Sequence, residues 1–132
     1  MGLLKGFVDN QKIKKFKEAE AKVNAVGMLD VAGSNYYVDG IMALISNRTM
    51  NPSKWNEIPC KLEPDPKNEH DPNAVKVMAK DAAGAWQLIG FVPAEFAVTV
   101  KSVLAAGAYC YLIAKPDSHE ATGFTFKVKL FI

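Results

Sequence analysis

The chain has 132 residues, of which 49% are hydrophobic and 23% charged, as expected of one globular domain. Sixteen Lys and Arg against 14 Asp and Glu give a net charge of +2, which excludes a histone-like polybasic binder but permits a local binding patch. No apolar run reaches the roughly 20 residues that span a bilayer, and no signal peptide is recognisable. A cytoplasmic protein without membrane contact is therefore predicted.

The segment 1–24 is predicted to hold a basic amphipathic helix over 10–24, ahead of a barrel domain over 25–132. Apolar residues recur there at helical spacing, at Ile13, Phe16, Ala19 and Val23. Six lysines against three acidic residues give this segment a local charge of +3. Its lysines form either the solvated face of a docked helix or a cationic arm near a phosphate backbone.

The rest of the chain reads as short strands with two helical inserts. Apolar or alternating stretches predict strands over 26–33, 58–63, 73–80, 86–92, 108–114 and 123–131. A short helical stretch begins at Asp39, and a second helix begins at Pro93 and ends before Gly107. The segments 47–57 and 64–72 are predicted loops. Mainly β or α+β structure, as a small barrel with helical inserts, is expected.

The sequence carries none of the common catalytic or metal-binding motifs. There is no G-x-S-x-G, no glycine-rich phosphate loop and no H-E-x-x-H. Two histidines and two cysteines lack zinc-type spacing, so neither a metal nor a cofactor is expected. Cys60 and Cys110 lie in apolar contexts and are predicted to be buried free thiols. A non-catalytic protein is predicted.

The loop from Pro64 to Asn73 is the chemically dense part of the chain. Seven of its ten residues are Asp, Asn or Pro. Asp and Asn bond neighbouring backbone groups and Pro fixes φ, so one interpretation is a turn. A turn needs only one or two such residues, so the other interpretation is a rigid loop that presents a carboxylate and two amides to a small polar group. The residues alone leave both open.

Three blocks of the sequence, in order over about 28–114, resemble a known family. They read VAGSNYY from Val31, EPDP from Glu63 with HDPNAVKV from His70, and IGFVPAEFA from Ile89. In these blocks the chain resembles the HIRAN domain, a module found at the front of helicase-like transcription factor and related Snf2-type ATPases and in short bacterial proteins.

The resemblance implies a small OB-like antiparallel β-barrel that binds single-stranded DNA at its free 3′ end, in a setting of DNA repair. In the family, a tyrosine and a loop aromatic hold the terminal base, and an aspartate accepts a hydrogen bond from the 3′ hydroxyl. The nucleic-acid-binding residues implied here are Asn35, Tyr36, Asn68, His70, Asp71 and Phe91. Any processing of the DNA would need a separate helicase or nuclease.

Some of these roles have alternatives. If the first block is a strand, Tyr36 and Tyr37 face opposite ways and either one is the exposed tyrosine. Asp71 either contacts the ligand or merely organises its loop through backbone hydrogen bonds. A small hydrolase built on His70 and Asp71 is a further alternative.

The phosphate-binding half of the family site is weakened in this chain. Asn35 replaces a phosphate-contacting arginine, and Ala94 replaces a basic residue. Residues 31–114 carry seven basic and eight acidic side chains. The cationic side chains that could contact phosphates in place of the missing residues are Lys76, Lys101 and Arg48. The same weakening favours a second hypothesis, a protein–protein interaction module that has kept the barrel and lost DNA binding.

Overall fold

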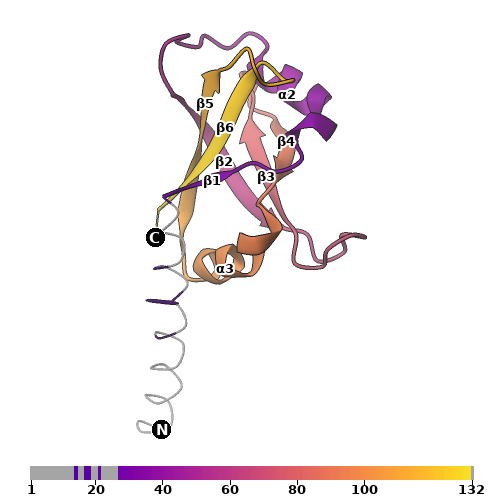
Figure 1. Ribbon diagram of the computed structural model, residues 1–132, viewed down its shortest axis with the longest axis vertical. Helices are drawn as coiled ribbons and strands as arrows, with labels where there is room; N and C mark the ends of the chain where they lie inside the picture. The colour runs from indigo at the N-terminus through magenta and orange to yellow at the C-terminus, as the bar shows by residue number, and fades with distance from the viewer. Residues whose placement is uncertain (1–13, 15–16, 19–20, 22–26, 132) are drawn as a thin grey trace, which may run out of the picture.

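The computed structural model describes residues 14, 17, 18 and 21 and the continuous stretch 27–131 (Figure 1). In chain order, its elements within 27–131 are β1 (Met28–Asp30), the 3-10 turn η1 (Ser34–Tyr36), α2 (Val38–Ile45), β2 (Asn56–Pro64), β3 (Val75–Lys80), β4 (Trp86–Phe91), α3 (Ala94–Ala105), β5 (Tyr109–Pro116) and β6 (Phe124–Phe131).

The six strands form one antiparallel sheet in the order β1-β6-β5-β2-β3-β4. The sheet curls, and its two ends meet just after β1, where Ala32 forms a bridge with Phe91. Two backbone hydrogen bonds make this bridge, from Ala32 N–H to the Phe91 carbonyl at 2.7 Å and from Phe91 N–H to the Ala32 carbonyl at 2.9 Å. The predicted fold class, mainly β with helical inserts, is confirmed.

Gly90 allows the two ends of the sheet to come this close. Its φ is +155°, and a Cβ atom there would lie 2.6 Å from the Ala32 carbonyl oxygen and 2.5 Å from Val31 Cγ1. Any side chain would therefore push the strand ends apart. The glycine next to Phe91 is thus a requirement of sheet closure.

Alternation along the strands fills the interior of the curled sheet. On β3, Val75, Val77 and Ala79 are buried, while the residues between them are half-buried. This period of two is what a strand with one buried face requires. Fully buried Leu29, Ile58, Ile89, Leu112 and Val128 continue the core on the other strands.

The two helices lie at opposite ends of the curled sheet (Figure 1). α2 buries Ile41 and Leu44, and it packs mainly against β4. α3 buries Ala97, Val100 and Val103, which recur at helical spacing. α3 ends at Ala105, ahead of Gly107, whose φ of +99° suits the turn into β5.

Several strand boundaries differ from the predicted ones, among them those of β3, which begins at Val75 rather than at residue 73, and of β5, which ends at Pro116 rather than at residue 114. The first strand ends at Asp30 rather than at residue 33, because Gly33 has a left-handed φ of +72° and directly precedes η1. β2 begins at Asn56, inside the predicted loop 47–57, because the Asn56 side-chain amide donates to the Ala114 carbonyl of β5 at 3.2 Å.

The four described residues of the N-terminal segment, Lys14, Lys17, Glu18 and Ala21, are helical and exposed. The docking expected through Ile13, Phe16 and Val23 lies outside the described residues. No helix in the described part of the chain is long and apolar enough to cross a membrane. Cys60 and Cys110 are free thiols, as predicted, and Cys110 is buried, whereas Cys60 is only half-buried.

Candidate functional site

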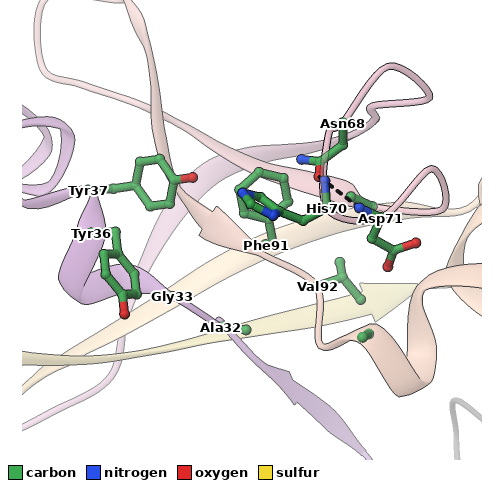
Figure 2. Close-up of a pocket in the computed structure, with 11 residues that line it drawn as sticks. Ala32, Gly33, Tyr36, Tyr37, Asn68, His70, Asp71, Phe91 and Val92 are labelled. Atoms are coloured by element: carbon green, nitrogen blue, oxygen red, sulfur yellow. Dashed lines mark hydrogen bonds between the residues drawn. The ribbon is translucent and has the colours of Figure 1, made fainter.

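A pocket of about 540 Å³ lies where the two ends of the sheet meet (Figure 2). Its lining comes from η1 and the chain before it, from the loop between β2 and β3, and from the end of β4. The lining residues are Ala32, Gly33, Tyr36, Tyr37, Asn68, His70, Asp71, Ala74, Phe91, Val92 and Ala94. The pocket combines an apolar floor and aromatic rings with one carboxylate.

The two tyrosines of the first block have different roles. Tyr36 is 88% exposed, whereas Tyr37 is half-buried and packs on Phe91 with ring centroids 5.8 Å apart. Both follow the left-handed Gly33, Tyr36 as the last residue of η1 and Tyr37 as the residue before α2. Tyr36 is therefore the ring that is free to meet a ligand, and Tyr37 supports the floor.

Asn68 organises the polar side of the pocket. Its side-chain carbonyl accepts hydrogen bonds from the backbone N–H groups of His70, at 2.9 Å, and Asp71, at 3.0 Å (Figure 2). Its amide donates to Asp65 Oδ2 at 3.2 Å. The loop is closed by the Asp65 N–H, which donates to the Ala74 carbonyl at 2.8 Å. His70 and Asp71 are thus held by a hydrogen-bonded scaffold.

The Asp71 carboxylate uses one of its two oxygens to organise the loop. Its Oδ1 accepts the Asn73 backbone N–H at 2.8 Å, which is a loop-organising Asx turn. Oδ2 accepts no hydrogen bond from the described residues. One oxygen therefore serves the loop, and the other is available to a donor in the pocket.

A family model for the HIRAN domain matches residues 26–130, which is most of the chain and includes every lining residue of the pocket. The chain belongs to the HIRAN family. HIRAN domains are in general DNA-binding modules, and the domain is a binding domain rather than a catalytic one. No curated protein matches the chain.

Two solved structures are similar to this HIRAN chain. A protein from Lactobacillus plantarum is 16% identical with a TM-score of 0.51, covering 80% of this chain and 93% of that one, and shares the fold. The HIRAN domain of human HLTF is 19% identical with a TM-score of 0.48, covering 79% of this chain and 72% of that one.

Of the six binding residues that the HIRAN resemblance implied, the pocket brings together Tyr36, Asn68, His70, Asp71 and Phe91. Asn35 is exposed in η1 and does not line the pocket.

The three candidate phosphate contacts are spread over the domain. Lys76 pairs with Phe91 across β3 and β4, so its side chain leaves the same sheet face as the Phe91 ring. Lys101 of α3 donates to Asn73 Oδ1 at 3.1 Å, beside the polar loop. Arg48 donates to the carbonyls of Leu44 and Lys80, remote from the pocket lining. Lys76 and Lys101 are near the site, and Arg48 is a structural residue.

Sequence reasoning did not assign Ala32, Ala74 or Val92 to the site, although they form part of the apolar lining. All three lie in the family blocks, which carried a usable signal. The position of Ala32 depends on its bridge to Phe91, a contact between distant segments. Among the described residues, no group of three or more His, Cys, Asp or Glu side chains is arranged to hold a metal ion.

Proposed function

We propose that this HIRAN domain binds single-stranded DNA by taking the 3′-terminal nucleotide into the pocket at the Ala32–Phe91 bridge. The observation that carries the proposal is the Asp71 side chain, which lines the pocket, is held by its loop through Oδ1 and leaves Oδ2 without a partner among the described residues, while the exposed ring of Tyr36 lies on the other side of the lining (Figure 2). A terminal nucleotide offers an aromatic base and a sugar hydroxyl, which match these two sides.

The aromatic side of the pocket suits a nucleobase. Tyr36 exposes nearly its whole ring, and His70 is an exposed ring in the facing loop. Stacking on such side chains contributes about 1–3 kcal/mol per base in single-strand binders. Stacking tolerates any base, so little base preference is expected.

The carboxylate side of the pocket suits a free hydroxyl. A carboxylate accepts hydrogen bonds and donates none, so Asp71 Oδ2 pairs with a 3′ hydroxyl. A 3′ phosphate offers only negative oxygens at the same point and would be repelled. A preference for hydroxyl ends over phosphate ends follows from the charge of one residue.

The pocket offers little positive charge to the phosphate groups of a DNA strand. No Lys or Arg is present among the eleven lining residues. Lys76 and Lys101 are the nearest candidates, on the sheet face of Phe91 and beside Asn73. Affinity is therefore expected to be low, with few phosphates engaged.

A second candidate function, protein binding, is favoured by one observation on the outer face of the sheet. Tyr109 and Tyr111 of β5 are 60% and 40% exposed, and Tyr109 stacks on Phe131 with centroids 5.0 Å apart. Exposed aromatic clusters of this kind mark interaction surfaces. If the domain binds DNA through the pocket, Tyr36→Ala should lower its affinity for DNA. If it binds only a protein through the outer face of the sheet, Tyr109→Ala should lower its affinity for that protein.

The test is a titration of the wild-type protein with one single-stranded oligonucleotide prepared with a 3′ hydroxyl and with a 3′ phosphate. The proposal predicts tighter binding of the hydroxyl form by roughly tenfold or more, as for a charged hydrogen bond. A 5′ phosphate on the same oligonucleotide is the control and should change little. Equal binding of both 3′ forms would contradict end recognition, and no binding of either would favour the protein-binding alternative.

A further inference from the structure

The two cysteines of the chain face each other inside the sheet, away from the pocket. β2 and β5 are antiparallel neighbours (Figure 1), and their pairing runs to Pro59–Tyr111. The next position of the same register places Cys60 opposite Cys110. Their Sγ atoms are 3.7 Å apart, and Cys110 Sγ is 3.6 Å from the Cys60 carbonyl oxygen. The thiol pair therefore lies where the hydrogen-bonded ladder between the two strands stops.

The backbone around this pair already has the spacing that a disulfide needs. Directly opposite residues of antiparallel strands have Cα atoms about 4.5–5.5 Å apart, within the roughly 4.4–6.8 Å of natural disulfides. The sulfurs must approach from 3.7 Å to about 2.05 Å, a closure that side-chain rotation can supply. Cys110 is buried and Cys60 is half-buried, so a small reagent reaches the pair from the Cys60 side.

The pair also favours one thiolate. The hydrogen bond that joins the two thiols lowers the pKa of Cys110. The same hydrogen bond and burial raise the pKa of Cys60. A thiol with a lowered pKa forms its thiolate, the nucleophilic form of cysteine, more readily.

We propose that Cys60 and Cys110 are a redox modification site that hydrogen peroxide converts to an intramolecular disulfide. A thiolate of the pair attacks one peroxide oxygen, the O–O bond breaks, and hydroxide leaves a sulfenic acid behind. The second sulfur, as its thiolate, attacks that sulfur, so that the S–S bond forms, the S–O bond breaks and a second hydroxide leaves. The two thiol protons convert both hydroxides to water, and the two sulfurs supply the two electrons that reduce the peroxide.

The disulfide would lock the junction between the two halves of the sheet. The β2–β5 pairing joins β1, β6 and β5 to β3 and β4. A cross-link just beyond Pro59 and Tyr111 prevents the two strands from separating at their open end. Closing a loop of this length restricts the unfolded chain, so the oxidised protein should melt roughly 5–15 °C higher.

The test uses the full-length protein, fully reduced and then treated with a small excess of hydrogen peroxide. The intact mass should fall by two hydrogen atoms, a digest should contain a peptide that links Cys60 to Cys110, and the melting temperature should rise. A thiol reductant should reverse all three. None of these readouts depends on DNA binding.

Cys60→Ala is the matched control, and Cys110→Ala replaces it if the first variant does not fold. Either variant should gain oxygen under peroxide and show no rise in melting temperature. Oxygen adducts of the wild-type protein without the cross-link, disulfide-linked dimers, or thiols that stay unreacted would each overturn the proposal.

Discussion

Asn68 and Asp71 are joined by a hydrogen bond of 3.0 Å from the Asp71 backbone N–H to the Asn68 side-chain carbonyl. The same carbonyl accepts the His70 N–H, so one amide positions both polar residues of the pocket. The geometry of the site therefore depends on a residue that need not touch the ligand.

Asn68→Ala should lower oligonucleotide affinity several-fold and destabilise the fold by about 0.5–1.5 kcal/mol, because two backbone donors lose their acceptor. Affinity is measured by titration and stability by denaturant unfolding. Asn73→Ala is the matched control in the same loop, since its side chain bonds Lys101 rather than the residues of the pocket. Equal affinity losses in the two variants would contradict the positioning role of Asn68.

Ala94→Lys should tighten DNA binding, because Ala94 lines the pocket at the first residue of α3 and has no charge to offer a phosphate. Two or three phosphates engaged by the wild type correspond to a slope of about −2 in log affinity against log salt, at about −0.7 per phosphate. The variant should steepen this slope by about 0.7. Ala105→Lys adds the same charge at the far end of α3. An equal gain from that control would show that overall charge, and not the pocket, is responsible.

Deletion of residues 1–24 should lower the melting temperature if the predicted helix packs on the domain through Ile13, Phe16 and Val23. Each such side chain contributes about 1.5–3 kcal/mol when fully buried. The exposed Tyr111 is a candidate surface, because it pairs with Lys129, which pairs with Met28 at the start of β1.

The control for this deletion is the double variant Lys14→Gln and Lys17→Gln, whose side chains are exposed. It should leave the melting temperature unchanged. If the deletion leaves the melting temperature unchanged but flattens the salt dependence of DNA binding, the segment is a cationic arm.

The charge of Asp81 should stabilise the fold at neutral pH, and this stabilisation should be lost in acid. The Gln87 side-chain amide and the Ala85 backbone N–H, both donating to this carboxylate, hold the pKa of Asp81 below its usual range. A lowered pKa in the folded state stabilises the protein above the unfolded-state value of about 3.9, and this contribution is lost as the pH falls through the folded-state value. Asp81→Asn should therefore destabilise the protein at pH 7 and much less at pH 3.

Denaturant unfolding at both pH values measures this difference. Glu69→Gln, an exposed carboxylate with no hydrogen-bond donor among the described residues, is the control and should change stability little at either pH. A cost of Asp81→Asn that is the same at both pH values would contradict the role of its charge.

Local patterns predicted most of the fold. The alternation of Val75 and Val77 with Lys76 marked β3, and Pro93 and Gly107 bracketed α3 within a few residues. These signals work because the period of buried residues and the turn residues are local properties. The limits of β1 could not be predicted this way, because its end depends on the left-handed Gly33 and on the bridge to β4.

The site was predictable in its chemistry and not in its geometry. The loop composition alone left a turn and a pocket both open, and it was the resemblance to the HIRAN domain that implied Asn68, His70 and Asp71, which all line the pocket. The choice between Tyr36 and Tyr37 could not be made, because strand alternation does not apply to a 3-10 turn followed by a helix. The sequence made Arg48 a candidate phosphate contact, but in the structure its guanidinium donates to two backbone carbonyls.

The role of Asp71 is tested most directly by measuring the affinities of wild type and Asp71→Asn for the same oligonucleotide ending in a 3′ hydroxyl and in a 3′ phosphate. The substitution keeps the shape and an acceptor oxygen and removes the charge. End recognition by this carboxylate predicts that the variant narrows the preference for the hydroxyl end by about 1–3 kcal/mol. Fold stability should change by less than about 1 kcal/mol. An unchanged preference for the hydroxyl end, together with a large loss of fold stability, would contradict end recognition by this carboxylate. Asp71 would then serve only its loop, through the Asn73 N–H.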